Sequence, residues 1–285
     1  CQIRGEKLTP DTHPSVLGAR HMPQEETCLR VRLLGLAAAE AAQQREPVVV
    51  APRRGFPRFP LRERRATGHD VDNDRDGRVD NPQVVAAMVR QKATLVMFAT
   101  EREAERLERT LPDRWQDSHQ AVALFAEETH PGGAARRRFD ASYEEIFHLI
   151  THAGYAAAYP AVFGMRPGSQ LANAMDRARG GRFLRVPRRY PAKAWYTYDD
   201  RSCDYGCQTQ EYIYWGMTSL LGAQSAEWRF RDIRQEWRLN TPKKFRAGAP
   251  MLYRLQTDTP YRFPKRLPDG KYRVSSKSAR QPSSP

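Results

Sequence analysis

Residues 142–154 read SYEEIFHLITHAG, and this stretch decides how the middle of the chain is expected to fold. Its apolar residues recur at the three- and four-residue spacing of an amphipathic α-helix. Ser142 stands at the expected N-cap, and Glu145 occupies the position that completes a capping box. We therefore predict an α-helix over 142–154.

One face of this predicted helix carries side chains that can bind a metal ion or move a proton. At about 100° per residue, four such side chains fall within an arc of roughly 100°. They are Glu144, Glu145, His148 and His152. Two imidazoles one turn apart can hold one ion, and a carboxylate one turn earlier can supply another ligand. The alternative is a solvated polar face that binds no metal.

The pattern resembles the HExxH helix of zinc metallopeptidases, in particular the gluzincin group, with Glu144 in place of the first histidine. Gluzincins take a further ligand from a later helix, and Glu211 is expected to open the next strongly apolar helix, 211–221. The resemblance implies that Glu145 is the general base. The same resemblance implies that the zinc ligands are His148, Glu211 and either Glu144 or His152. Two negative carboxylates make the bound ion a weaker Lewis acid. A site of this kind can bind metal while it cuts peptides slowly or not at all, so the domain is expected to be either an active or a degenerate peptidase. A shared ion requires the His148 ring and the Glu211 carboxylate to lie within about 7 Å.

A second motif lies at residues 72–80, which read DNDRDGRVD. Carboxylates at alternate positions can surround a calcium ion, and a glycine at the sixth position permits the sharp turn. The stretch resembles the calcium loops of EF-hand, dockerin and thrombospondin type 3 modules, and Val79 is expected to pack inward. The resemblance implies as ligands Asp72, Asp74, Asp76, the carbonyl of Arg78, Asp80 and, in place of the usual glutamate, Gln83.

The missing glutamate predicts a weak site, with an affinity of about 0.1–1 mM, in which Ca²⁺ serves as a structural staple. The alternative is a turn rich in aspartate with no ion.

Composition excludes some classes of protein. The 285 residues contain no apolar run near 18 residues, and the mean hydropathy is -0.76, so no membrane-spanning helix is expected. The net charge of +14 suggests a polyanionic partner, but it is concentrated in residues 229–285, which hold 15 Lys+Arg against 4 Asp+Glu. No zinc-finger, helix-turn-helix or RNA-binding signature accompanies these residues, so nucleic acid is not favoured as a partner.

The expected fold is α+β, with zincin-like helices packed on a small sheet and the calcium loop near its N-terminal edge. Residues 1–67 are expected to form a disordered arm in which 30–42 is either the remnant of a secretory signal or an alanine-rich helix. The main domain is expected over 68–265 and a disordered basic tail over 266–285. The other helices expected in the main domain are 82–90, 101–109, 170–179 and 227–237, and its expected strands are 93–98 and 120–129.

Cys203 and Cys207 flank a tight turn, which favours a small disulfide over a pair of free thiols. A disulfide in turn indicates an exported protein. The rival to a peptidase is a non-catalytic, calcium-stabilised extracellular module that binds a peptide, protein or glycan. Its binding surface would be residues 194–200, AWYTYDD, although aromatics at alternate positions more often pack a core.

Overall fold

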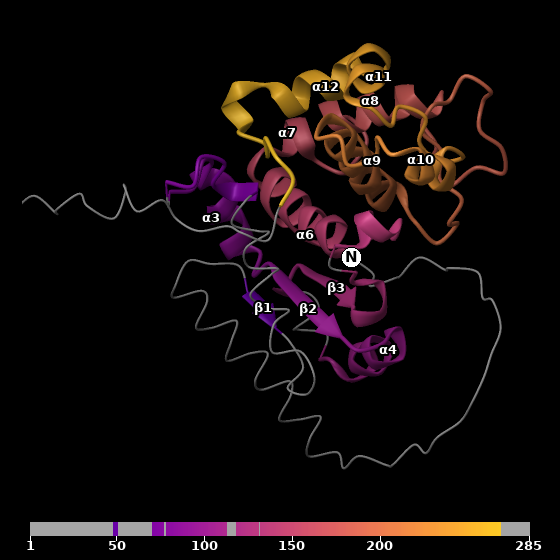
Figure 1. Ribbon diagram of the computed structural model, residues 1–285. Coiled ribbons are helices and arrows are strands. Elements are labelled where there is room, and N and C mark those ends of the chain that lie inside the picture. Colours follow the sequence, from indigo (N-terminus) through magenta and orange to yellow (C-terminus); the bar gives the residue numbers. More distant parts are fainter. Residues whose placement is uncertain (1–47, 51–69, 77, 113–117, 131, 269–285) are drawn as a thin grey trace, which may run out of the picture.

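The computed structural model describes residues 48–50, 70–76, 78–112, 118–130 and 132–268, and within them a small sheet lies beside a larger group of helices (Figure 1). The sheet has three parallel strands in the order β1-β2-β3. These strands are β1 (Val48–Val50), β2 (Thr94–Phe98) and β3 (Ala121–Phe125). The expected α+β class is therefore confirmed, and β1 comes from the segment predicted as an arm.

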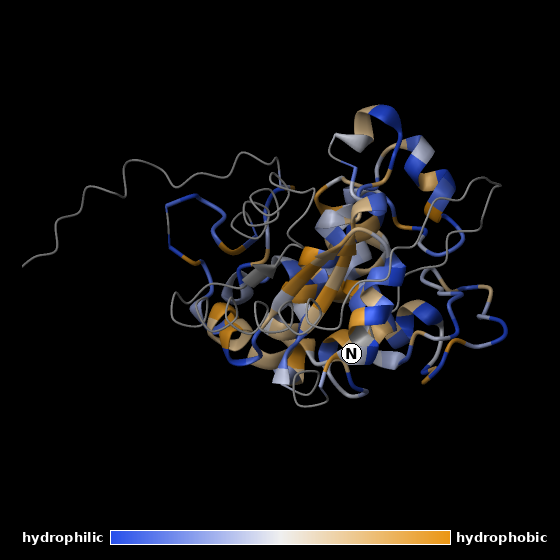
Figure 2. Ribbon diagram, turned by 90° about the horizontal axis from the view of Figure 1, so that it is seen from below, coloured by the Kyte–Doolittle hydropathy of each residue, from blue (hydrophilic) through white to orange (hydrophobic). Residues whose placement is uncertain are grey.

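The two strands β2 and β3 bury side chains on both faces of the sheet. Leu95 and Met97 face the main core, whereas Val96 and Phe98 pack on the opposite face against α4 (Glu101–Thr110). This alternation follows from the two-residue period of a strand. Because both faces are covered, the strands are apolar along their length, as Figure 2 shows.

Helix α6 (Ser142–Leu149) packs on β2 and β3 and continues directly into η3 (Ile150–Ala156), a π-helix. The prediction of one α-helix over 142–154 is therefore right only up to Leu149. The predicted cap is wrong, because Ala141 is the N-cap and the Ser142 hydroxyl instead donates to Asp140 Oδ1 at 2.7 Å.

Helix α9 (Tyr205–Leu220) lies at the centre of the helical group and contacts α6 and three other helices. It begins six residues before the predicted start at Glu211, so that Glu211 lies in its second turn. The Asp204 carboxylate caps the helix by accepting a hydrogen bond from the Cys207 amide at 2.8 Å. The first turn, Tyr-Gly-Cys-Gln, lacks the apolar periodicity from which the prediction was made.

The other helices surround α9 or cover the flanks of α6 and η3. They are α3 (Pro82–Arg90), α7 (Pro160–Phe163), α8 (Gln170–Arg179), α10 (Glu227–Ile233), α11 (Pro242–Gly248) and α12 (Pro250–Thr257). Helices α3 and α8 match the predicted ranges 82–90 and 170–179. The 3-10 turns are η1 (Ala126–Glu128), η2 (Gly133–Arg136) and η4 (Thr259–Tyr261), the first replacing the predicted end of strand 120–129.

The predicted disulfide between Cys203 and Cys207 is present and joins the loop before α9 to its first turn. In the part of the chain that the structure describes, no helix is both long enough and apolar enough to cross a membrane. The predicted signal remnant or helix at 30–42 and most of the predicted tail lie outside the described residues.

Candidate metal centre

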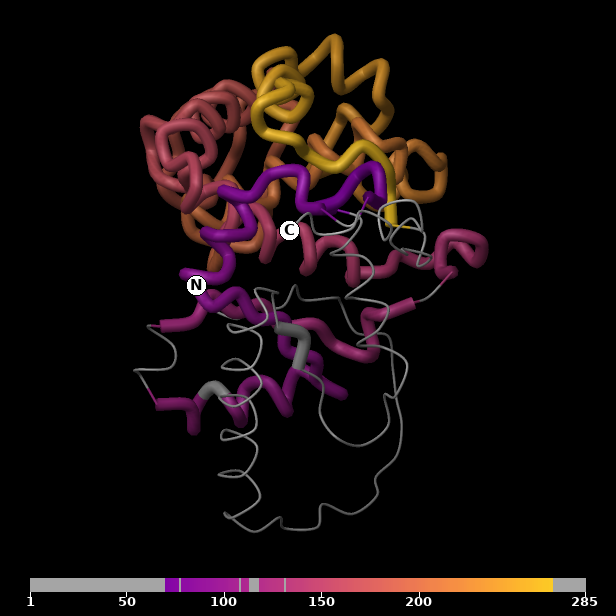
Figure 3. The backbone as a smooth tube through the Cα atoms, turned by 90° about the vertical axis from the view of Figure 1, so that its left-hand side faces the viewer, coloured from indigo at the N-terminus to yellow at the C-terminus, as the bar shows by residue number. Residues whose placement is uncertain are grey.

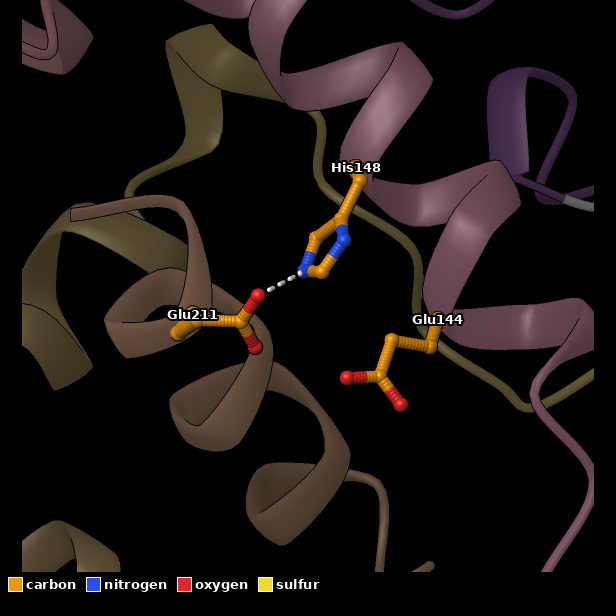
Figure 4. A group of neighbouring side chains, drawn as sticks. All are labelled: Glu144, His148 and Glu211. Atoms are coloured by element: carbon orange, nitrogen blue, oxygen red, sulfur yellow. Dashed lines mark ion pairs between the residues drawn. The ribbon is translucent and has the colours of Figure 1, made fainter. Parts of the chain in front are cut away.

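Three side chains from two separate helices converge in the interior. Glu144 and His148 lie one turn apart on α6, and Glu211 reaches them from α9 (Figure 4). One potential ligand atom from each of the three lies within 4.8 Å of the other two, and all three residues are buried. Nε2 of His148 is 3.6 Å from Oε1 of Glu211, well inside the limit of about 7 Å for a shared ion.

The protonation of His148 suits a metal ligand. Burial and, to a smaller extent, the nearby His152 lower the pKa of its imidazole to about 3, so the ring is neutral at pH 7. Its Nε2 is buried and has no hydrogen-bond partner among the residues that the structure describes. Metal binding requires the neutral imidazole, and this nitrogen offers its lone pair towards the two carboxylates.

The spacing also fits a small divalent cation. Two ligands of a tetrahedral zinc ion, each at about 2.1 Å, stand roughly 3.4 Å apart. The 3.6 Å between the imidazole and the Glu211 carboxylate is close to this value. Carboxylate and imidazole together form a donor set that zinc, manganese and iron accept. The three residues therefore make a site that could hold a metal ion.

Glu145 lies next to this group but not within it. Its Oε2 is 4.0 Å from Nδ1 of His148, the ring nitrogen that does not face Glu211, and about a quarter of its side chain is exposed. At 4.0 Å the two atoms are too far apart for a hydrogen bond, but the negative charge on this side of the ring electrostatically favours the tautomer that carries its proton on Nδ1. That tautomer directs the Nε2 lone pair towards Glu144 and Glu211.

His152 does not join the three clustered residues. It lies in the π-helix, whose i→i+5 hydrogen bonding widens the turn and changes the angle between successive residues. The four-residue spacing from His148 therefore no longer places both imidazoles on one ion. Burial lowers the pKa of His152 to about 4, opposed in part by Asp204, and its Nδ1 is buried without a hydrogen-bond partner.

The acidic loop brings together three of its carboxylates. Asp72, Asp74 and Asp76 each offer an oxygen within 4.8 Å of the others. Asp72 and Asp74 accept hydrogen bonds from the Asp76 amide at 3.1 and 3.2 Å, which curls the loop around their oxygens. This cluster is the second place among the described residues that could hold a metal ion.

The remaining predicted loop ligands are placed differently. The Asp80 carboxylate accepts hydrogen bonds from the backbone and side-chain amides of Asn73 and is not part of the cluster. Gln83 is an exposed residue in the first turn of α3, and the Arg78 amide donates to Asp76 Oδ1 at 2.7 Å. Val79 is 39% exposed, so the prediction that it packs inward is wrong.

Hydrogen bonds attach the acidic loop to the end of the domain. Asn73 Oδ1 accepts from the Lys265 amide at 2.8 Å, and the Asn81 side chain donates to the Tyr261 carbonyl at 2.9 Å. Figure 3 shows the loop and this C-terminal segment side by side. The loop therefore joins two regions that are far apart in the sequence.

A cleft of about 1410 Å³ opens beside the Glu-His-Glu group, and Glu144 is part of its lining. Three other lining residues, Tyr198, Asp199 and Asp200, belong to the segment 194–200 that the sequence marks as a possible binding surface. No sequence signal marks the remaining ones, which come mainly from α4, η1, α10 and nearby loops. In the aromatic segment, Tyr196 is fully buried and Tyr198 lines the cleft.

Comparison with protein-family models, curated proteins and solved structures finds no match for this chain.

Proposed function

We propose that this chain is an exported, metal-dependent hydrolase of the metallopeptidase kind, with zinc held by Glu144, His148 and Glu211. The observation that carries the proposal is the meeting of an imidazole and two carboxylates from α6 and α9 at one buried point beside a large cleft. The disulfide between Cys203 and Cys207 supports export, because such bonds persist in oxidising compartments.

Bound at this point, zinc would polarise a substrate carbonyl and make a water molecule more acidic. His148 would donate the lone pair of Nε2, and the two carboxylates would balance the charge of a divalent ion. Glu144 lines the cleft, so a substrate would approach from its side. The two carboxylates make the ion a weaker Lewis acid than a site with two histidines would, and slow turnover is expected.

Glu145 has two candidate roles in this proposal. The metallopeptidase resemblance makes it the general base, whereas its position beside Nδ1 supports a role in orienting His148. The substitution Glu145→Gln separates the two. Loss of a base removes turnover and leaves metal affinity unchanged, and loss of the orienting contact weakens metal binding about 10–100-fold.

The test of the site is metal analysis of the purified full chain by mass spectrometry, followed by zinc titration after chelation. Wild-type protein should bind one zinc tightly, and Glu211→Gln should lose it. Glu227→Gln is the matched control, because Glu227 is exposed on α10 and remote from the cluster. Equal zinc binding by wild type and Glu211→Gln would refute the assignment.

Hydrolysis is tested separately with a mixture of internally quenched peptides. Cleavage should disappear with chelator and return when zinc is added. A protein that holds zinc at this site but cleaves no peptide would make the domain a degenerate member of the class.

We also propose that the acidic loop binds Ca²⁺ as a structural staple through Asp72, Asp74 and Asp76. With an affinity near 0.5 mM, 10 mM Ca²⁺ would stabilise the fold by about 2 kcal/mol. Thermal melts with and without Ca²⁺ measure this gain. The exposed Asp74, changed to Asn, should reduce it, and an equal gain in that variant would contradict the assignment.

The second candidate function is a calcium-stabilised binding module without catalysis. It is favoured by the clustered loop carboxylates, but Tyr196 of its expected binding segment is buried in the core. Protein that retains calcium alone and never zinc would support this candidate over the hydrolase.

A further inference from the structure

The cleft beside the Glu-His-Glu group has a charge opposite to that of the chain as a whole. Nine carboxylate residues and four arginines line it, although the chain carries a net charge of +14. Acidic residues stand on both sides: Glu101, Glu105 and Glu127 on the α4 and η1 side, and Asp199, Asp200 and Asp232 on the helical side.

The arginines of the cleft only partly offset these carboxylates. Arg109 lies 3.9 Å from Glu105 in an exposed pair on α4. Arg229 stacks on the ring of Phe139 at 4.0 Å and lies over Trp215 at 5.6 Å. Arg229 is therefore held against aromatic rings of the cleft by cation–π contacts, and four arginines leave an excess of five carboxylates among the lining residues.

The size of the cleft suits an extended chain. Pockets for drug-sized ligands span about 300–1,000 Å³, and this one is larger at about 1410 Å³. Glu144 is one of its lining residues and belongs to the same cluster as the buried Nε2 of His148, which has no hydrogen-bond partner in the described part of the chain. A ligand lying along the cleft therefore passes the point where chemistry is proposed.

We infer that this cleft binds cationic peptide segments, whose lysine and arginine side chains lie between its two acidic sides. This inference deepens the proposed function by naming its substrate class, and it rests on that function only where hydrolysis is concerned. Binding depends on the cleft itself, since carboxylates on both sides attract a positively charged chain and repel an acidic one.

Binding is measured by fluorescence anisotropy on the full chain, with three labelled ten-residue peptides of equal length. One carries four arginines, the second four glutamines at the same positions, and the third four glutamates. The arginine peptide should bind at least ten-fold more tightly than the others, and its affinity should fall as salt rises from 50 to 500 mM.

A charge-matched pair of double variants locates the binding. D199N/D232N removes two exposed carboxylates from the cleft, and E227Q/D258N removes two exposed ones outside it. The first double variant should weaken binding of the arginine peptide about four-fold, from roughly two-fold for each of the two exposed charge contacts. The second should change it less than two-fold.

Equal binding of the three peptides, or equal weakening by both double variants, would overturn the inference. Anisotropy requires no turnover, so the two proposals fail separately. Charge-selective binding without cleavage would refute the hydrolase alone, and cleavage of all three peptides at equal rates would refute the cationic selectivity alone.

Discussion

Gly154, in the π-helix, allows α3 to approach the helix that carries the candidate metal ligands. A Cβ atom at this position would stand 2.7 Å from Val84 Cγ1 and 3.1 Å from Met88 Cγ. Both partners are buried side chains of α3, at 1% and 0% exposure, so neither can turn into solvent. The substitution Gly154→Ala therefore forces α3 and η3 apart or forces Val84 from its rotamer.

The expected cost follows from two opposing terms. Overpacking of a close-packed core costs about 1–3 kcal/mol, and a contact as short as 2.7 Å places this substitution in the upper part of that range, at about 2–3 kcal/mol. Replacing glycine by alanine within a helix returns about 1 kcal/mol. We expect a net loss of about 1–2 kcal/mol in the free energy of unfolding. In a domain of this size, the melting temperature should fall by roughly 3–6 °C.

Urea denaturation of wild type and variant measures this loss as a lower midpoint with an unchanged m-value. Gly206→Ala is the matched control, because its Cβ would meet Asp204 Oδ1 at 3.4 Å and Met165 O at 3.6 Å, which are ordinary contacts. The control should be neutral or up to about 1 kcal/mol more stable. A Gly154→Ala protein as stable as wild type, or a control that loses as much, would refute the reasoning.

Three other perturbations have expected outcomes. Burial lowers the pKa of His152 in the folded protein from 6.5 to about 4. As pH falls from 6.5 to 4, His152 is therefore protonated in the unfolded chain but not in the folded one, and the free energy of unfolding drops by up to roughly 3 kcal/mol. His152→Gln should give a flatter profile of urea midpoint against pH, and an unchanged slope would contradict this. Asp204→Ala removes the cap of α9 and should cost about 1 kcal/mol in urea unfolding, whereas Asp204→Asn should cost much less. Replacing both Cys203 and Cys207 by serine removes the disulfide and should lower the free energy of unfolding by about 2 kcal/mol, which is the loop-closure entropy of so short a ring. Urea unfolding of this variant and of wild type, both without reductant, measures the loss.

Much of the secondary structure could be predicted where local signals agree. Helix 170–179 has a capping serine, Ser169, at one end and Gly180 in a left-handed conformation at the other, and both boundaries were predicted correctly. Helices α11 and α12 were missed, since Pro242 and Pro250 were interpreted as interruptions. Both prolines stand at the first helical position, where a missing amide hydrogen costs nothing.

The candidate site was predictable only in part. Glu144 and His148 were named from residue type and spacing, and Glu211 from the resemblance to the metallopeptidase helix. The choice between Glu144 and His152 depended on the π-helix, which no local pattern indicates. The cleft as a whole could not be predicted, although Tyr198, Asp199 and Asp200 of its lining lie in the segment 194–200 that was named as a possible binding surface. Its two sides come from segments that tertiary packing brings together, and their charges have no common spacing in the sequence.

The contact between α3 and η3 links the two candidate ion sites through one pair of packed helices. The acidic loop leads directly into α3, and η3 continues the helix that bears Glu144 and His148. If an ion in the loop alters the affinity of the interior cluster, the interior ion must alter the affinity of the loop by the same factor. Zinc can be titrated with and without calcium, or calcium with and without zinc. Both experiments should then give the same coupling free energy.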